Sequence, residues 1–296
     1  MALKSSRLRD PVAEPRWLVA PAWLWYVGFF VAPLVIMVAY SFAQNDPQEF
    51  FTVTFGFYTE QFQRVWDPIY LSIYRNTVIM AFLGTVGCLL IGYPFAYFLA
   101  TRAGKHKTLL FLLVIVPFWT SLLIRTYAWV LILGERGPLS DGLEWVGLLD
   151  RPLDVLYTPG AVLVGVIYDY LPLMVFPLYV AIERMDVRLK EASRDLGAGR
   201  WSTFWRVTMP LTAPGILTGC LLTFIPMMGE YVVPEILGGA KSYLIGNLIA
   251  NEFRTAIDWP FGAALGMTLV VLMLIVIFVY LRVLGRRAEE NLGAAM

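Results

Sequence analysis

The run NTVIMAFLGTVGCLLIGYPFAYFL, from Asn76 to Leu99, contains no charged side chain. A membrane-spanning helix needs roughly 20 mostly apolar residues, so this run is long enough to cross a bilayer. A strand of a membrane barrel would be about ten residues long and would alternate in polarity, which this run does not do. Because a helix satisfies its own backbone hydrogen bonds in lipid, the run predicts a transmembrane helix.

Five further runs have the same character. They extend from Trp17 to Phe42, Leu109 to Leu133, Ala161 to Ala181, Leu211 to Val233 and Phe261 to Leu284. The first is longer than the roughly 7–15 apolar residues of a cleaved signal, so we expect it to be retained. Charged residues make up 15% of the chain, against about 25% in soluble domains. The sequence predicts an all-α integral membrane protein with one six-helix domain, residues 17–284, between tails 1–16 and 285–296.

Lys and Arg indicate the side of the membrane on which each loop lies, because cytoplasmic loops are enriched in both. They are concentrated in the two chain ends, the second loop and the fourth loop. The basic residues of these segments are Lys4, Arg7, Arg9 and Arg16; Arg102, Lys105 and Lys107; Arg184, Arg188, Lys190, Arg194, Arg200 and Arg206; and Arg282, Arg286 and Arg287. This distribution predicts that both ends are cytoplasmic.

The fourth loop, residues 182–210, is predicted to contain two short helices. Its sequence is MDVRLKEASRDLGAGRWSTFWRVTMPLTAPG from Met185 to Gly215, which includes the start of the next span. Asp186 can cap a first helix, Gly197 can end it in the left-handed conformation, and Ser202 can begin a second helix. The first helix has a short apolar face, which suits either an amphipathic helix at the membrane surface or a helix that docks into the groove of a partner.

This loop resembles the EAA loop of ABC importer permeases. The similarity rests on Glu191-Ala192-Ser193, then Gly197, then Val207-Thr208-Met209-Pro210. Ser193 and Met209 depart mildly from the Ala and Leu of the pattern. The resemblance implies a type I ABC importer permease fold, in which this loop is the coupling helix that docks into an ATPase. The residues expected to couple are Glu191, Ala192, Ser193, Asp195, Leu196 and Gly197.

Other segments are similar to spermidine/putrescine permeases. They are Pro117–Ser121, Arg125–Trp129, Tyr170–Pro172, Pro177–Tyr179, Gly229–Glu235 with Gly238-Gly239, and Asp258–Pro260. The resemblance implies a subunit of the bacterial inner membrane that works with a second, different permease, two ATPase subunits and an extracytoplasmic solute-binding protein. ATP and Mg²⁺ are expected on the partner ATPase, and no cofactor on this chain. Relatives that carry another organic cation, an amino acid-like solute or ferric iron share some of these segments.

Three charged residues fall within or beside the predicted spans. Arg125 and Glu230 lie at similar outer heights on straight helices that rise about 1.5 Å per residue, and Asp169 lies deeper. An ionised side chain near the bilayer centre costs roughly 2.5–3.5 kcal/mol, so each needs a partner or a cavity. Arg125 either extends outwards or pairs with Glu230. Asp169 lines a substrate pathway, bonds to another helix or contacts a partner subunit.

Aromatic residues surround these charges, as recognition of a cation with a methylene stem requires. Ammonium groups are attracted both to carboxylates and to aromatic faces. The predicted pathway residues are Asp169, Tyr170, Glu230, Tyr231, Tyr127, Trp129 and Glu235. Aromatic residues are also common at membrane interfaces, which would account for Trp129. Between Glu235 and Trp259, the positions of Leu244, Leu248 and Ile249 predict a short outer helix.

Several functions are disfavoured. A net charge of +1 provides no basic field for nucleic acid, and the Cys and His residues have no metal-ligand spacing. No Walker A motif is present, so ATP hydrolysis is expected from another chain. An intramembrane enzyme would need a nucleophile and a base in reach of each other, which the sequence does not indicate. An ATP-independent secondary transporter or channel remains the alternative, although no internal repeat favours it.

Overall fold

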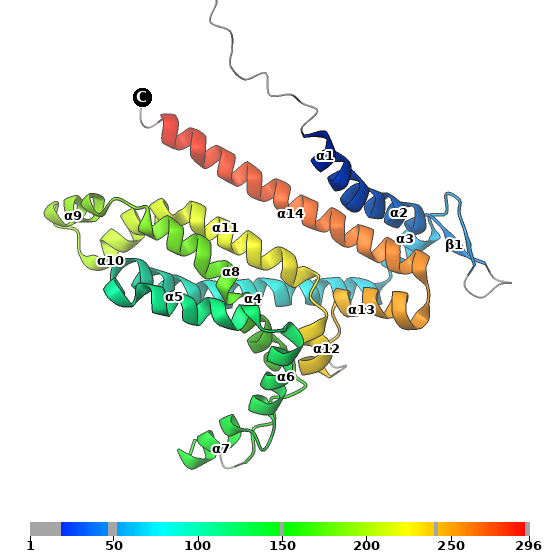
Figure 1. Ribbon diagram of the computed structural model, residues 1–296, viewed down its shortest axis with the longest axis horizontal. Helices are drawn as coiled ribbons and strands as arrows, with labels where there is room; N and C mark the ends of the chain where they lie inside the picture. The colour runs from blue at the N-terminus through cyan, green and yellow to red at the C-terminus, as the bar shows by residue number, and fades with distance from the viewer. Residues whose placement is uncertain (1–18, 47–51, 149–150, 240–241, 294–296) are drawn as a thin grey trace, which may run out of the picture.

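The computed structural model describes residues 19–46, 52–148, 151–239 and 242–293 (Figure 1). The predicted N-terminal tail, residues 1–16, lies outside this part of the chain. The helices and strands are α1 (Ala20–Tyr26), η2 (Val27–Val31), α2 (Ala32–Ser41), β1 (Gln44–Asn45), β2 (Val53–Thr54), α3 (Glu60–Val65), α4 (Pro68–Thr101), η3 (Gly104–His106), α5 (Lys107–Ile115), η4 (Val116–Trp119), α6 (Leu122–Leu133), α7 (Pro138–Trp145), α8 (Pro159–Glu183), α9 (Val187–Asp195), α10 (Arg200–Thr203), η5 (Phe204–Thr208), α11 (Met209–Met228), α12 (Val232–Gly238), α13 (Ile245–Asn251), η6 (Glu252–Ala256) and α14 (Trp259–Gly293). The all-α membrane fold class is confirmed.

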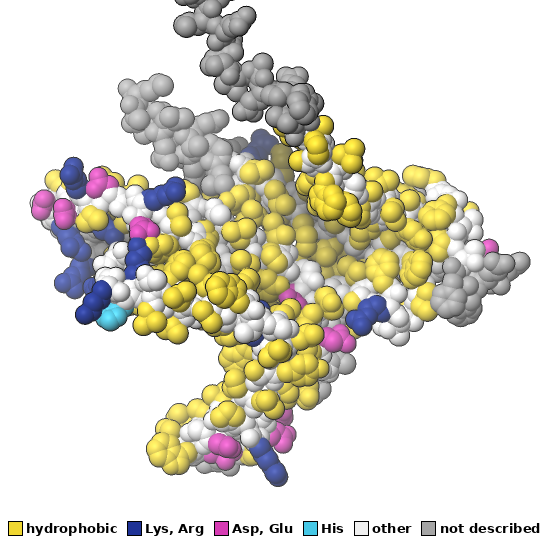
Figure 2. Space-filling view, viewed as in Figure 1, with side chains coloured by type: hydrophobic (Ala, Val, Ile, Leu, Met, Phe, Trp, Pro, Cys, Tyr) yellow, Lys and Arg dark blue, Asp and Glu magenta, His cyan; other side chains and the backbone are white. Residues whose placement is uncertain are grey.

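Within the described residues, five helical segments are long and apolar enough to span a membrane, and a bent helix pair brings the number to as many as six. The spanning helices run roughly parallel, and α4, α8 and α14 end on the side of the molecule that carries α9 and α10 (Figure 1). Apolar side chains cover the middle of the bundle, whereas Lys and Arg gather around α9 and α10 (Figure 2). This distribution matches a bundle surrounded by lipid, with one charged end.

The helices begin where their sequences allow it. Pro68 and Pro159 each occupy the first turn of a long helix, where the missing N–H costs no hydrogen bond. The Thr158 hydroxyl accepts a hydrogen bond from the backbone N–H of Ala161 at the start of α8. The helix α8 continues through two internal prolines to Glu183. Local capping therefore accounts for where these spans begin.

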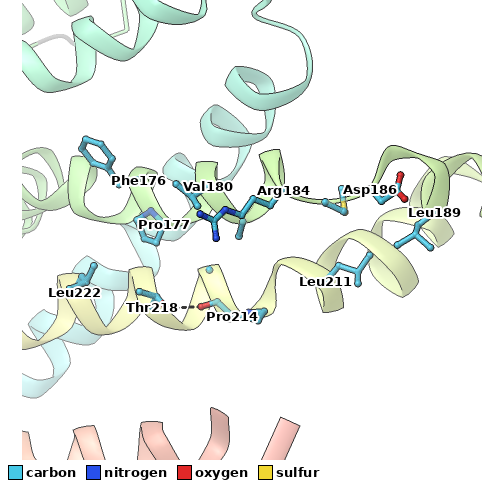
Figure 3. A pocket seen from close by; sticks show the side chains of 13 residues that line it. Phe176, Pro177, Val180, Arg184, Asp186, Leu189, Leu211, Pro214, Thr218 and Leu222 are labelled. Carbon is cyan, nitrogen blue, oxygen red and sulfur yellow. Dashed lines mark hydrogen bonds between the residues drawn. The ribbon is translucent and has the colours of Figure 1, made fainter. Parts of the chain in front are cut away.

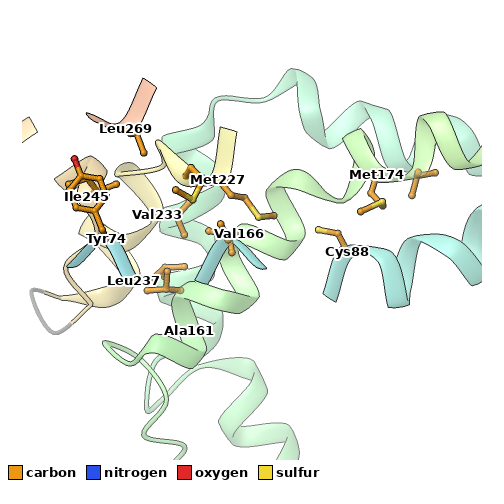
Figure 4. Packing of buried hydrophobic residues seen from close by; sticks show 14 of the residues in the cluster. Tyr74, Cys88, Ala161, Val166, Met174, Met227, Val233, Leu237, Ile245 and Leu269 are labelled. Atoms are coloured by element: carbon orange, nitrogen blue, oxygen red, sulfur yellow. The ribbon is translucent and has the colours of Figure 1, made fainter. Parts of the chain in front are cut away.

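The core lies where α4, α8 and α11 pack against one another. Met174 of α8 lies close to Cys88 of α4, and both are fully buried (Figure 4). Hydrogen bonds also join the helices: the Tyr93 hydroxyl lies 3.1 Å from the Thr212 hydroxyl. The Tyr74 hydroxyl donates to the Leu265 carbonyl of α14 at 2.7 Å. The two hydrogen bonds join α4 to α11 and to α14. The packing of α8 against α4 and α11 holds α8, which carries Asp169, in place.

Gly215 allows α8 and α11 to approach closely. A Cβ atom at this position would lie 2.8 Å from the Pro177 carbonyl oxygen and would also meet the Ala181 side chain. Small residues at such crossings are common in membrane bundles. Because both obstacles belong to the packed helix α8, they cannot move aside independently.

We expect Gly215→Ala to destabilise the helix pair by about 1–3 kcal/mol through overpacking. Thermal unfolding of the detergent-solubilised complex measures the effect. Gly142→Ala is the matched control, because a Cβ atom there meets nothing within 4 Å. Equal melting temperatures for the two variants would contradict this account of α8–α11 packing.

The predicted third span is not straight. Segments Gly104–Trp119 and Leu122–Trp145 meet at an angle of 100°. Thr120 and Ser121 lie between them with extended backbone angles. The helices α6 and α7 therefore leave the bundle as an arm (Figure 1). The prediction of one continuous helix from Leu109 to Leu133 was wrong, because apolar composition alone does not reveal a break.

The predicted fifth span also ends earlier than expected. The helix α11 stops at Met228, and a separate helix, α12, begins at Val232. Glu230 therefore lies in the turn between two helices and not inside a span. The short helix predicted between Glu235 and Trp259 is confirmed as α13, residues Ile245–Asn251. A two-stranded ribbon, in which Gln44 pairs with Thr54, was not anticipated.

Candidate functional site

The loop between α8 and α11 forms the predicted helix, glycine break and second helix. The Asp186 carboxylate accepts a hydrogen bond from the backbone N–H of Arg188 at 2.9 Å and caps α9. Gly197 ends this segment with φ of +85°, a conformation that glycine adopts without strain. The second helix, α10, begins at Arg200, slightly before the predicted Ser202.

Most of the predicted coupling residues are accessible on this loop. Glu191, Ala192, Asp195 and Leu196 are exposed, and Leu196 is 89% exposed. Ser193 is half-buried, and its hydroxyl lies 3.2 Å from the Thr203 hydroxyl, which ties α9 to α10. The capped helix α9 makes few contacts with the rest of the chain, and an exposed leucine lies at its end. Such a surface is suitable for docking into the groove of a partner.

A second contact that the sequence did not reveal steadies α9 on the bundle. The Lys190 ammonium lies 3.5 Å from the Tyr97 hydroxyl and 4.8 Å from the centre of the Tyr97 ring. Tyr97 belongs to α4, far away in the sequence, so helical periodicity gave no sign of the pair. The contact links the loop between α8 and α11 to α4, a central spanning helix.

Beside this loop, a groove of ≈ 730 Å³ lies between α8 and α11. Phe176, Val180 and Leu222 line its apolar length, and Arg184 and Asp186 lie at the end nearest α9 (Figure 3). Asp169 belongs to the same helix, α8, further towards the outer end. The groove therefore extends as a mostly apolar surface along α8 and α11 from α9 towards the part of α8 that carries Asp169.

The charged residues pair differently from the prediction. Arg125 does not bond to Glu230; its Nη1 atom lies 3.0 Å from the Oδ1 atom of Asp169. The two side chains are 11% and 4% exposed, so the pair is buried. Arg125 reaches Asp169 because the bend before α6 redirects the arm, whereas the predicted heights assumed straight helices.

The geometry of this ion pair is incomplete. No N–H of Arg125 points at Asp169 well enough to form a hydrogen bond, and neither carboxylate oxygen accepts one from the described residues. The Nε atom of Arg125 also has no hydrogen-bond partner among them. Buried polar atoms normally have hydrogen-bond partners, so these two oxygens and this nitrogen retain unused hydrogen-bonding capacity.

In contrast, both carboxylate oxygens of Glu230 accept hydrogen bonds. The Tyr170 hydroxyl donates to its Oε2 atom at 2.5 Å. Its Oε1 atom accepts the backbone N–H of Val232 at 2.8 Å and that of Val233 at 3.3 Å. Glu230 therefore fixes the start of α12. Asp169 interacts electrostatically with both Glu230 and Arg125, so the two carboxylates, Arg125 and Tyr170 form one cluster.

The predicted aromatic residues fall into two groups. The Trp129 ring packs edge-on against Tyr168 with centroids 5.4 Å apart, so Trp129 contributes to the packing of α6 on α8. Tyr127 and Tyr231 are 59% and 42% exposed, which leaves their faces accessible. Tyr170 donates a hydrogen bond to a carboxylate of the cluster.

Glu235 lies on the outer side of α12 and is held by Asn247 of α13. The Asn247 amide donates to the Glu235 Oε2 atom at 2.8 Å and to the Tyr231 carbonyl at 2.9 Å. Asn247 was not predicted, because an asparagine within a short helix gives no sign of its partners on another helix. It connects two predicted pathway residues to one buried amide.

A separate polar network surrounds Asp258 at the end of the bundle that lies away from α9 (Figure 1). The Asp258 carboxylate accepts hydrogen bonds from Arg64 at 2.9 Å, from Asn45 at 3.0 Å and from the backbone N–H of Phe261 at 3.2 Å. Beside it, burial and the neighbouring Asp258 charge raise the pKa of Glu252 above its ordinary value, although Arg64 opposes this shift.

Replacing Glu252 by glutamine is expected to stabilise this outer network near neutral pH. A raised folded-state pKa means that the ionised carboxylate costs folding free energy above that pKa, and the cost disappears as the pH falls through it. The gain in melting temperature from Glu252→Gln should therefore shrink on acidification. Thermal unfolding at neutral and acidic pH tests this, and a gain that grows with acidity would contradict it.

Comparison with known proteins supports the membrane-protein fold seen in the structure. The sequence pattern of the family described as binding-protein-dependent transport system inner membrane component matches residues 92–289. The chain is 43% identical over 258 residues to the spermidine/putrescine transport system permease protein PotB of Escherichia coli, covering 87% of this chain and 93% of that protein.

Solved structures share the fold. One is a bacterial ABC transporter involved in the import of the acidic polysaccharide alginate, with a TM-score of 0.69, 17% identity, and coverage of 92% of this chain and 94% of that chain. Another is the alginate transporter in complex with a periplasmic protein that carries an alginate pentasaccharide, with a TM-score of 0.67, 18% identity, and coverage of 90% and 91%.

Proposed function

Because the chain belongs to the family of binding-protein-dependent transport system inner membrane components, we propose that it forms half of the translocation pathway of an ATP-driven importer for polyamines such as spermidine and putrescine. The identity of 43% over 87% of the chain to a spermidine/putrescine permease carries this proposal. It is a permease subunit of the bacterial inner membrane and does not itself hydrolyse ATP.

The coupling role falls to α9 and the turn that follows it. Glu191, Ala192, Ser193, Asp195, Leu196 and Gly197 make up the proposed surface for an ATPase subunit. Its exposed leucine and flanking charges support helix-in-groove docking. Two ATPase subunits, which hold ATP and Mg²⁺, would close and move this loop together with the ends of α8 and α11.

The pathway role falls to the outer cluster and the surfaces beside it. Asp169 and Glu230 supply carboxylates for a cation, and Tyr170, Tyr231 and Tyr127 supply aromatic faces. Trp129 supports this region by packing on Tyr168, and Glu235 lies at its outer edge. Two carboxylates and one guanidinium in a buried cluster favour a cationic substrate over an anionic one.

The assembly and its orientation are part of the same proposal. A second, different permease completes the pathway, and an extracytoplasmic binding protein delivers the substrate. We place α9 in the cytoplasm because basic residues gather there (Figure 2). The helix α14 ends on the same side (Figure 1), which supports a cytoplasmic C-terminus. An even number of spans puts the N-terminus there too.

Uptake by the complete transporter tests the substrate. Cells that lack their own polyamine importers would express this chain together with its proposed partners: the ATPase, the second permease and the extracytoplasmic binding protein. We expect uptake of labelled spermidine or putrescine, which an excess of the other polyamine reduces. A transporter that imports an amino acid, another organic cation or ferric iron but no polyamine would overturn the substrate assignment and leave the permease class intact.

A further inference from the structure

The ion pair between Arg125 and Asp169 is buried, yet several of its polar atoms have no hydrogen-bond partner among the described residues. Its atoms are 3.0 Å apart, but both Asp169 oxygens and the Arg125 Nε atom lack hydrogen bonds from the described residues. A purely structural buried pair is stable only when further hydrogen bonds satisfy the remaining polar atoms. This carboxylate therefore retains acceptor capacity for another donor.

The cluster also contains one more carboxylate than it contains cations. Asp169 and Glu230 contribute two carboxylates, and Arg125 is the single cation among the four side chains of the cluster, which Tyr170 completes. Glu230 already accepts three hydrogen bonds, so Asp169 is the group that lacks donors. A single ammonium group would supply both the missing charge and the missing donors.

Arg125 has a means of leaving Asp169. It lies in the first turn of α6, directly after the extended Thr120–Ser121 break. The guanidinium carbon already lies 5.4 Å from the centre of the Phe118 ring, and an aromatic face can hold the cation after it leaves the carboxylate.

We propose that Arg125 is a tethered counter-cation: its guanidinium occupies the Asp169 carboxylate between transport cycles and is displaced by one ammonium group of the substrate. The proposal rests on the polyamine-import function. It explains why a carboxylate needed for a cationic substrate can stay buried in the absence of that substrate. Arg125 thereby weakens substrate retention and promotes release.

Paired variants of the complete transporter in lipid nanodiscs test this exchange. Arg125→Gln removes the competitor, so we expect spermidine retained by the complex to increase about tenfold and ATP-driven turnover to fall about tenfold. Asp169→Asn should reduce both retention and turnover at least about tenfold. The double variant Arg125→Gln/Asp169→Asn should assemble, because neither member of the ion pair is left without its partner, but should stay as inactive as Asp169→Asn.

The alternative is that the pair only anchors α6 to α8. In that case the double variant recovers wild-type turnover, or Arg125→Gln reduces retention as much as Asp169→Asn, and either result overturns the proposal. Arg125→Lys keeps the charge and covers the case in which Arg125→Gln fails to assemble: exchange predicts retained turnover with altered retention, and unaltered retention counts against it.

A second ion pair provides the matched control. Lys107 and Glu183 pair at the other end of α8, where both side chains are exposed. The double variant Lys107→Gln/Glu183→Gln should leave spermidine retention unchanged, and a change as large as that of Arg125→Gln would contradict a local exchange. Spermidine uptake by the wild-type transporter in the same assay distinguishes failure of the proposed function from failure of the exchange. If the wild type takes up no spermidine, the proposed function is refuted. If it does, and the Arg125→Gln/Asp169→Asn variant is fully active, only the exchange is refuted.

Discussion

Replacing residues 187–197 by a flexible Gly/Ser linker of equal length is expected to abolish binding of the ATPase subunit and to reduce ATP-driven uptake at least about 100-fold. This change removes α9, its Asp186-capped first turn and the Gly197 turn, but it keeps α8 and α11 connected. Affinity in helix-in-groove complexes is concentrated in a few residues. Co-purification of the ATPase with the tagged permease gives the result.

A single residue should show the same effect in weaker form. Leu196 is 89% exposed at the end of α9, so Leu196→Ser removes apolar contact without opening a cavity in the bundle. We expect about tenfold weaker ATPase binding. Leu148→Ser is the control, because Leu148 is 69% exposed beyond α7, away from this surface. Retained ATPase binding by the linker variant would refute α9 as the coupling element.

Glu230→Ala is expected to destabilise the outer half of the permease by about 3 kcal/mol and to reduce uptake about 100-fold. The substitution leaves three donors without their acceptor: the Tyr170 hydroxyl and the backbone N–H groups of Val232 and Val233. Glu230 is 7% exposed, so water cannot easily replace the lost carboxylate. Thermal unfolding and spermidine uptake measure the two effects.

Glu230→Gln separates the charge from the hydrogen bonds. Its amide oxygen can still accept the N–H of Val232, and its amide N–H can donate to the Tyr170 hydroxyl. We therefore expect near wild-type stability but at least about tenfold lower uptake if the charge attracts the cation. Glu144→Gln, on the exposed arm helix α7, should change neither quantity. Wild-type uptake with Glu230→Gln would remove Glu230 from the pathway and leave it as a helix cap.

Local features of the chain were predictable. The apolar runs gave the spanning helices, and Asp186 and Gly197 gave the limits of the coupling segment, because capping and left-handed turns depend on nearby residues. The positions of Leu244, Leu248 and Ile249 gave the outer helix α13 for the same reason. Each of these signals lies within one or two turns of the structure that it predicts.

The bend before α6 could not be predicted in this way. Leu109 to Leu133 is one apolar run, and the 100° turn at Thr120–Ser121 depends on contacts of α6 with α8 and α12. The charge pairing failed for the same reason. Equal heights on straight helices suggested Arg125 with Glu230, whereas the bend brings Arg125 to Asp169 and the end of α11 turns Glu230 towards Val232.

The partners of Glu230 and Glu235 show the same limit. Tyr170 is separated from Glu230 by 60 residues, and Asn247 from Glu235 by 12. Tyr170 was predicted as an aromatic face for the substrate, but it also donates to the carboxylate. Packing of α12 between α8 and α13 creates both contacts, and no spacing within a single helix reveals them.

The most direct test of an ATP-driven permease is uptake into proteoliposomes that contain this chain, its second permease and the ATPase subunits. The loaded binding protein is placed outside and ATP with Mg²⁺ inside. We predict that labelled spermidine accumulates only when ATP is hydrolysed, and that the variant with a linker in place of residues 187–197 accumulates none. Accumulation by this chain alone, driven by an ion gradient without ATP, would contradict the account.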